Sequence, residues 1–496
     1  MNDIRKLAGQ TVVYGFGTVV PRFLNYALLT PFYTYIFSRE QYGIVTELYA
    51  WMVLALVILT YGMETTYFRF AGKKAPAETV YGTALVSLFA TSAFFLLAVS
   101  LFIAPVSEFL GYGKHPEYIK MFAWIVAIDA FSAIPFAWLR ANNRAAIFSV
   151  LKIINVVVTI GSVFFFLQTA PKIAAGGSEW ILRLYKPGFD VGYVFVANLI
   201  GSVVTLLLLA PFFLRIRPSF DGRLLGRMLT YSWPLLVGGI AGSMNEVLDK
   251  ILLRRLIGGA EGLETVGLYG AGYKVGVLMS LFIQMYRFAA EPFFFEKAGR
   301  HDAKETYAVT MKYFVITALI LFLVINLYIE ALQVIIGPVF RESLVVVPVI
   351  SMGYLLLGIF INQSIWYKVD DKTIYGAWIT LLGAAVTIAV NVIFVPRFGY
   401  IAAAWAHVAC YMTMVSVSYV VGQKLYPIDY EIKRIVSYIA LAVTLYIVAK
   451  VLEGDNRVVN IALDTGLLFV FFAAVQKKDR FFTLLFKIRH ENTDSK

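Results

Sequence analysis

The residues best able to do chemistry in this sequence are charged residues that lie inside long apolar stretches. They are Arg22, Asp129, Glu246, Asp249, Lys250 and Lys274. A charged side chain at the centre of a membrane helix costs roughly 2.5–3.5 kcal/mol on insertion scales. We therefore expect these side chains to face protein or water rather than lipid, where they pair with one another or contact a charged substrate.

Polar residues recur at steps of three and four within several apolar stretches, which places them on one helical face. In chain order, these stripes contain Arg22 and Asn25; Lys152; Glu246, Asp249 and Lys250; and Gln284 and Arg287. We expect the stripes to line one central aqueous cavity.

Some of these charges have an alternative, purely structural interpretation. Glu246 and Lys250 are four residues apart and can pair along one helix, and Asp129 can pair with a neighbouring helix. Arg22 has no carboxylate one turn away, so its partner comes from another helix or from a substrate. Lys312 lies near an inner helix end, where we expect its long side chain to reach the lipid headgroups.

The composition places these residues in a membrane protein. The chain has 496 residues, of which 60% are hydrophobic and 15% charged, whereas soluble proteins are about 45–50% apolar and 25% charged. Its apolar runs are continuous, unlike the alternating segments of a transmembrane β-barrel. The sequence therefore predicts an all-α polytopic membrane protein without a sizeable extramembrane domain.

The apolar runs, separated by Gly, Pro and charged residues, predict about 14 transmembrane helices. They lie near residues 11–36, 44–66, 79–104, 118–138, 147–168, 191–213, 231–257, 266–290, 309–332, 344–366, 374–395, 399–421, 435–452 and 458–475. The longest outer connection, residues 169–190, is predicted to be an interfacial loop or short helix. Residues 477–496 are predicted to form a cytoplasmic interfacial tail, although a solvated tail is an open alternative.

The chain carries 43 Lys and Arg against 31 Asp and Glu, a net charge of +12. These cations lie between apolar runs rather than in one patch, which favours topology and an anionic substrate over nucleic acid. Most of them fall in alternate loops, which predicts that both termini are cytoplasmic in an inner or plasma membrane.

Several kinds of chemistry are missing from the sequence. The single cysteine, Cys410, allows no intrachain disulfide, and the four histidines are too scattered to suggest a metal site. No GxxxxGK[ST] segment is present, so nucleotide hydrolysis is not expected. The first outer loop, residues 38–43, is too short for a glycosyltransferase site, so we predict that the chain is not an enzyme. An ion gradient, the membrane potential or downstream metabolism stay open as energy sources.

Two pairs of segments resemble each other at nearly the same spacing along the chain. Trp138–Arg144 matches Trp366–Lys372, and Tyr42–Tyr49 matches Val266–Tyr273, each pair without a gap. This pattern predicts a duplication with a six-helix lobe at 1–217, a second at 218–424 and two additional helices at 425–476. Because six is even, both lobes have the same orientation, and the substrate site is expected at the interface between the repeats.

Four segments carry a resemblance to a known family. They are Asn391-Val-Ile-Phe-Val-Pro396-Arg-Phe-Gly399-Tyr-Ile-Ala-Ala-Ala-Trp-Ala406, Asp249-Lys250-Ile-Leu-Leu, Val266-Gly267-Leu-Tyr269 through Tyr273-Lys274, and Ala290-Glu-Pro292. They resemble the polysaccharide flippases of the MATE-like MOP superfamily, of the Wzx O-antigen type. Ala402 departs from the family's pattern, which often has Gly there.

The resemblance implies a V-shaped pair of six-helix lobes that alternate between inward-open and outward-open states. It also implies a cargo of polyprenyl-pyrophosphate-linked oligosaccharide moved from the inner to the outer leaflet, with a polysaccharide polymerase or glycosyltransferases as partners. The expected substrate-binding residues are Arg22, Asn25, Lys152, Lys250, Lys274, Gln284 and Arg287. The candidates for coupling to H⁺ or Na⁺ are Asp129, Glu246 and Asp249.

Three alternatives stay open. A multidrug antiporter of the same superfamily carries organic cations, for which a site would need acidic and aromatic residues without Arg22 and Lys274. A peptidoglycan-precursor flippase uses the same pyrophosphate chemistry. In a non-transporting scaffold of an envelope synthesis complex, the intramembrane charges would be structural.

Overall fold

The computed structural model describes residues 19–71, 76–214, 219–370 and 372–479, which form helices joined by short connections, with no β-strand among them. Two compact units are present: residues 1–270 with 380–403, and residues 271–379 with 404–496. The first unit thus extends past residue 217, because α12 (Gly222–Ile257) packs against α3 (Arg39–Thr60). The predicted boundary at residue 217 refers to a sequence duplication rather than to these compact units, and it stays a prediction. The V shape of the lobes also stays a prediction.

The first unit is a helical bundle in which α7 (Pro116–Ala141) is the central element. It packs against α3, α5 (Ala77–Leu101) and α11 (Gly192–Leu214), and α11 in turn packs against α8 (Ala145–Phe164). The smaller helices of this unit are η1 (Asn25–Leu29), α2 (Thr30–Ile36), α4 (Met63–Phe70) and α6 (Ile103–Leu110). Most of its buried side chains are apolar, but buried hydroxyl, amide and charged groups lie among them.

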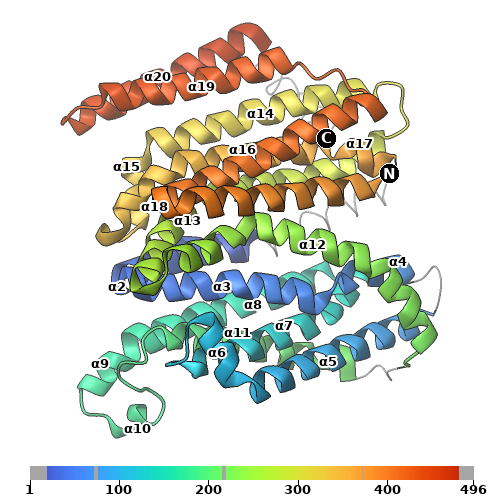
Figure 1. The fold of residues 1–496 in the computed structure, drawn as a ribbon, viewed down its shortest axis with the longest axis vertical. Coiled ribbons are helices and arrows are strands. Elements are labelled where there is room, and N and C mark those ends of the chain that lie inside the picture. The colour runs from blue at the N-terminus through green and yellow to red at the C-terminus, as the bar shows by residue number, and fades with distance from the viewer. Residues whose placement is uncertain (1–18, 72–75, 215–218, 371, 480–496) are drawn as a thin grey trace, which may run out of the picture. The chain divides into compact units, whose positions relative to one another are not determined.

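The second unit contains most of α13 (Gly259–Lys297), followed by α14 (Ala303–Leu327) and α16 (Val347–Gln363). Short helices α15 (Ile329–Leu332), η3 (Gln333–Ile335), η4 (Pro338–Val346) and α17 (Ile365–Val369) connect them. Figure 1 shows α19 (Ile432–Leu452) and α20 (Arg457–Asp479) side by side along α14, against which both helices pack.

The helices agree with the predicted membrane spans. Eleven helices in the described ranges are long and apolar enough to cross a membrane. One of them, α18 (Thr373–Leu425), contains two predicted spans, because the backbone leaves the helical region at Gly399, at φ 58° and ψ −142°. Adding α12, which carries a polar stripe, and the partly described first span gives the predicted set of about 14. The all-α polytopic fold is therefore confirmed.

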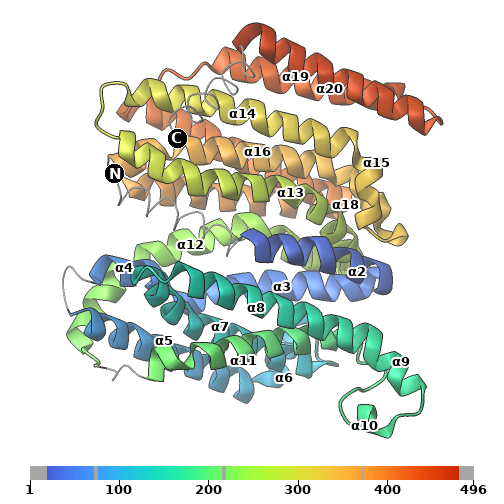
Figure 2. The same ribbon diagram turned by 180° about the vertical axis from the view of Figure 1, so that it is seen from behind.

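The connection predicted to lie outside forms two short helices, α9 (Ala170–Ala175) and α10 (Glu179–Leu182), with a bend between them. Figure 2 shows this segment extending beyond the end of α8. Its apolar side chains Trp180, Leu182 and Leu184 are all exposed, and the interfacial location stays a prediction. At the other end, α20 continues to Asp479, and the rest of the predicted tail lies outside the described residues.

The two turns predicted to be equivalent have the same backbone hydrogen bond. The amide of Arg144 donates to the carbonyl of Leu139, and the amide of Lys372 donates to the carbonyl of Tyr367, each at 2.8 Å. Leu139 aligns with Tyr367, and Arg144 with Lys372, in the matched segments. The sequence resemblance at these turns therefore corresponds to a shared local structure.

The backbones near the start of α3 and near the start of α13 pack closely at two glycines. These glycines occupy equivalent positions in the two predicted repeats. A Cβ at Gly43 would lie 2.0 Å from the carbonyl oxygen of Leu263, and a Cβ at Gly267 would lie 1.9 Å from that of Arg39. The second matched pair of segments makes Gly43 equivalent to Gly267, and the same offset, continued upstream of the matched residues, relates Arg39 to Leu263, so the contact is reciprocal. Only residues without a side chain let the two backbones approach this closely in a membrane.

Candidate substrate-binding site

The first helix of the site changes its winding where the polar stripe begins. Residues 19–24 are α-helical, residues Asn25–Leu29 form a π-helical turn, and α2 continues from Thr30. Pro31 follows this turn and has no backbone N–H to donate to the preceding turn, which disturbs the regular helix locally. Such π-turns often occur at functional sites because they rotate the side chains before them.

Arg22 and Asn25 precede or begin this turn. Arg22 is exposed, whereas Asn25 is partly buried, and its Oδ1 atom has no hydrogen-bond donor among the described residues. The phenol of Tyr26 lies within the electrostatic influence of both Arg22 and Glu246. Tyr26 therefore connects the polar stripe of the first span with that of α12 electrostatically, whereas a common cavity stays a prediction.

Lys152 brings a second cation into the same neighbourhood. Its ammonium lies 4.0 Å from the centre of the Phe136 ring, a cation–π contact. Arg22, Asp129 and Glu64 all act on it electrostatically. In the part of the chain that the structure describes, however, Lys152 forms no ion pair. This lysine is thus held over an aromatic face without a carboxylate in contact.

Asp129 belongs to a polar layer between α7, α8 and α11. The hydroxyl of Ser202 donates a hydrogen bond of 2.8 Å to Asp129 Oδ1, and Asn155 Nδ2 donates one of 2.9 Å to Thr205 Oγ1. Asp129 is therefore held by a neighbouring helix through a hydroxyl rather than through a cation.

Asp249 and Lys250 form a buried pair. Lys250 Nζ lies 2.9 Å from Asp249 Oδ1 and 3.1 Å from the main-chain carbonyl of Glu246, and Tyr269 donates a hydrogen bond of 2.6 Å to Asp249 Oδ2. Only 3% of Asp249 and 7% of Lys250 are exposed. Lys250 thus forms its ion pair with the carboxylate of its neighbour Asp249. Glu246, which the spacing suggested as the partner, accepts a hydrogen bond from Lys250 through its main-chain carbonyl.

The other predicted contacts lie in the second unit. Lys274 and Gln284 are partly buried, and Arg287 is 55% exposed with its Nε 3.0 Å from Glu291 Oε1. Lys368 lies 2.7 Å from the same carboxylate oxygen. This second cation, which we did not predict as a site residue, gives the cluster a net positive charge.

The predicted residues therefore divide between the two units. Arg22, Asn25, Lys152, Asp129, Glu246, Asp249 and Lys250 lie in the first, and Lys274, Gln284 and Arg287 lie in the second. A single cavity lined by both groups stays a prediction.

The sequence reasoning missed the buried carboxylate of Glu47. It is 0% exposed, accepts a hydrogen bond of 2.6 Å from Tyr112, and lies 3.7 Å from Arg254 Nε. Glu47 is an isolated charge in an apolar run, so the criterion that selected the other six charges would have found it.

The expectation that Lys312 snorkels to the headgroups was wrong. Lys312 is 6% exposed, and its ammonium lies 2.6 Å from Glu431 and 2.9 Å from Asp479. Arg434 lies 2.8 Å from each of the same two carboxylates, and the Tyr438 hydroxyl donates a hydrogen bond to Asp479. These charges attach α19 and α20 to α14. The partners of Lys312 lie more than a hundred residues further along the chain, so the sequence around Lys312 could not indicate them.

Comparison with known proteins decides the family. The model of the family described as polysaccharide biosynthesis protein matches residues 10–298. The chain belongs to this family. A search among curated protein sequences gave no match.

The fold is shared with solved transporters. The lipid II flippase MurJ in its inward closed conformation matches with a TM-score of 0.73 and 12% identity, over 94% of this chain and 99% of that chain. An inward-facing multidrug resistance MATE family transporter of the MOP superfamily matches with a TM-score of 0.61 and 14% identity, over 81% and 94%. The Vibrio cholerae MATE transporter VcmN in the bent form matches with a TM-score of 0.57 and 14% identity, over 85% and 96%.

The apolar helices and these matches together support a multi-pass membrane protein. The chain has the fold of solved flippases and transporters. Among the described residues, no group of three or more His, Cys, Asp or Glu is placed to hold a metal ion.

Proposed function

We propose that this protein is a flippase that moves polyprenyl-pyrophosphate-linked oligosaccharide from the inner to the outer leaflet for surface polysaccharide synthesis. Membership of the polysaccharide biosynthesis family supports a glycan cargo. The proposed location is the inner or plasma membrane with both termini cytoplasmic, and the proposed partners are a polysaccharide polymerase or glycosyltransferases.

The observation that carries this proposal is Lys152, whose ammonium lies over the Phe136 ring and forms no ion pair among the described residues. Arg22, from a different helix of the first unit, acts on Lys152 electrostatically, as do the carboxylates of Asp129 and Glu64. A pyrophosphate would accept charge-assisted hydrogen bonds from both cations, and Arg offers it paired N–H donors.

The rest of the cargo is assigned by its chemistry. The glycan would lie along the polar stripes that include Asn25 and Gln284, and the prenyl tail would stay in lipid. Lys250 is already neutralised by Asp249 and therefore contributes less to phosphate binding than Arg22 or Lys152. Lys274 and Arg287 are the proposed contacts of the second unit.

An ion gradient would drive the cycle through carboxylates that can exchange a proton or Na⁺. Asp129 and Glu246 are the first candidates, because Asp129 is held by a hydroxyl and Glu246 is exposed. Asp249 is a weaker candidate, since its two oxygens are already bonded to Lys250 and Tyr269.

A second candidate function is transport of a peptidoglycan precursor. The match to the lipid II flippase covers 94% of the chain, whereas the two MATE transporters cover 81% and 85%. The multidrug antiporter is disfavoured, because an organic cation would be repelled by Arg22 and Lys152.

The deciding experiment compares a deletion strain with its parent. Accumulated prenyl-pyrophosphate-linked oligosaccharide together with lost surface polysaccharide would support the proposal. Accumulated peptidoglycan precursor with normal surface polysaccharide would favour the second candidate. Unchanged glycan with increased sensitivity to cationic dyes would contradict both.

A further inference from the structure

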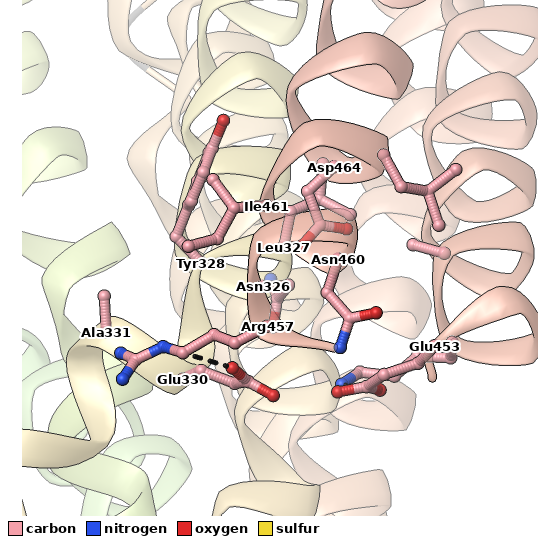
Figure 3. Close-up of a pocket in the computed structure, with 13 residues that line it drawn as sticks. Asn326, Leu327, Tyr328, Glu330, Ala331, Glu453, Arg457, Asn460, Ile461 and Asp464 are labelled. Carbon is pink, nitrogen blue, oxygen red and sulfur yellow. Dashed lines mark hydrogen bonds and ion pairs between the residues drawn. The ribbon is translucent and has the colours of Figure 1, made fainter. Parts of the chain in front are cut away.

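The end of α14, the end of α19 and the start of α20 enclose a polar cleft in the second unit (Figure 3). No part of the proposed transport route uses it. Its main polar residues are Asn326, Glu330, Lys450, Glu453, Arg457 and Asp464.

Asn326 lines the cleft with an unused hydrogen-bond acceptor. Its side chain is 0% exposed, and its Nδ2 donates a hydrogen bond of 2.7 Å to the carbonyl of Phe322. Its Oδ1 has no donor among the described residues. Figure 3 shows Asn326 between Asp464 and Glu330. Because a buried acceptor without a donor is unfavourable, this atom points to a ligand that donates a hydrogen bond.

Asp464 is a second unused acceptor. Among the residues that the structure describes, no donor or cation contacts its carboxylate, although Lys450, Glu453 and Glu330 act on it electrostatically. The other charges are already paired, since Glu453 lies 2.8 Å from Lys450 and Glu330 lies 3.8 Å from Arg457. Three carboxylates against two cations leave the cleft with a net negative charge, so it suits a cationic donor.

The position of the cleft indicates where this cation comes from. It lies at the ends of membrane-spanning helices, the level at which lipid headgroups meet the protein. Its flank carries large exposed apolar side chains, with Leu452 59%, Val458 75% and Val459 59% exposed. Apolar flanks next to buried polar acceptors fit a lipid molecule better than a cation free in water.

We propose that this cleft binds the headgroup of a phospholipid with a primary ammonium, of which phosphatidylethanolamine is the type. The ammonium has three N–H donors, and it donates to Asn326 Oδ1 and to the carboxylate of Asp464. Arg457, whose contact with Glu330 is long at 3.8 Å, faces the lipid phosphate. The lipid thereby bridges α14 and α20.

The test uses the full-length protein in detergent and measures lipid binding by native mass spectrometry. Phosphatidylethanolamine and phosphatidylcholine with identical acyl chains are compared, because the quaternary ammonium of the latter has no N–H donor. We expect phosphatidylethanolamine to bind about tenfold more tightly, the size of one charge-assisted hydrogen bond. Equal binding of the two lipids would overturn the proposal.

Two variants locate the site. Asn326→Leu removes the unused acceptor, and Asp464→Asn removes the charge; each is expected to weaken phosphatidylethanolamine binding about tenfold. The matched control is Asp455→Asn, since Asp455 is an exposed carboxylate of the same connection that does not line the cleft. An equal loss in the control, or no loss in Asp464→Asn, would contradict the assignment. If Asn326→Leu fails to fold, Asp464→Asn still decides.

Free ethanolamine distinguishes a lipid from a soluble amine. At the lipid concentration that saturates the cleft, ethanolamine is expected to cause no thermal stabilisation. If it stabilises the protein as much as the lipid does, and Asp464→Asn abolishes the effect, the ligand is a soluble amine and the lipid assignment fails.

Discussion

Two lysines in spanning helices of the first unit, Lys152 and Lys250, have opposite surroundings. Lys250 is buried against Asp249, which Tyr269 also holds, so its charge is neutralised within the protein. Lys152 lies over the ring of Phe136 without an ion pair among the described residues, and Arg22 adds a second cation nearby. The difference teaches that an intramembrane lysine without a direct ion pair is a better candidate for contact with the cargo than one that is bonded to a carboxylate.

Lys250→Ala tests the difference between the two lysines most directly, and we expect it to have the largest effect on stability. Removing the ammonium leaves the Asp249 carboxylate buried without its cation, which costs about 3–5 kcal/mol. The yield of folded protein and its melting temperature in detergent should both fall. The double variant Asp249→Asn with Lys250→Met should recover most of the loss, because no charge is left unpaired. A normal melting temperature for Lys250→Ala would remove the distinction between the two lysines.

Lys152→Ala and Arg22→Ala should have the opposite effect, in which transport falls and stability is retained. Each is expected to lower transport about 10- to 100-fold, because a charge-assisted hydrogen bond to the cargo contributes about 1.5–3 kcal/mol. Expression and melting temperature should stay close to those of the parent. Lipid-linked intermediate and surface polysaccharide in a complemented deletion strain are the measurements. Full surface polysaccharide in either variant would exclude that residue from the mechanism.

Asp129→Asn sharpens the comparison by changing the charge around Lys152 alone. The amide can still accept the hydrogen bond from Ser202, so folding should be preserved. We expect cargo binding to be retained while transport falls less than tenfold and loses its dependence on the proton or Na⁺ gradient. Transport measured in vesicles with an imposed gradient decides this, and an unchanged gradient dependence would exclude Asp129 as a coupling residue.

The smallest effect is expected for Lys172→Ala. Lys172 is an exposed cation on α9, away from the membrane-embedded charges. Transport and melting temperature should both stay within error of the parent, because exposed charges contribute little to stability. A clear loss of transport would mean that cations act through the net charge of the protein rather than through the Lys152 neighbourhood.

Much of the fold could be predicted from the sequence, because a helix that spans lipid must be long and apolar and must pair its backbone N–H and C=O groups internally. The spans 374–395 and 399–421 were predicted as separate for the same reason, and the structure places the break between them at Gly399. The helix equivalence at Arg144 and Lys372 followed from a direct resemblance.

The pairing of charges could not be predicted from spacing alone. Lys250 pairs with the adjacent Asp249, although the spacing along the helix favours Glu246. Lys312 is buried by Glu431 and Asp479, which both lie several helices further along the chain. Such pairs depend on which helices pack together, and only the three-dimensional structure supplies that information.

The reciprocal contact of Gly43 and Gly267 has a consequence for ancestry. It is the contact that a two-fold homodimer of half-length chains would make, with one glycine used on both sides of its axis. In such a homodimer a single codon determines both halves of the contact. In the fused gene that the predicted duplication implies, the two halves mutate independently, so each glycine has to be retained by selection in its own right.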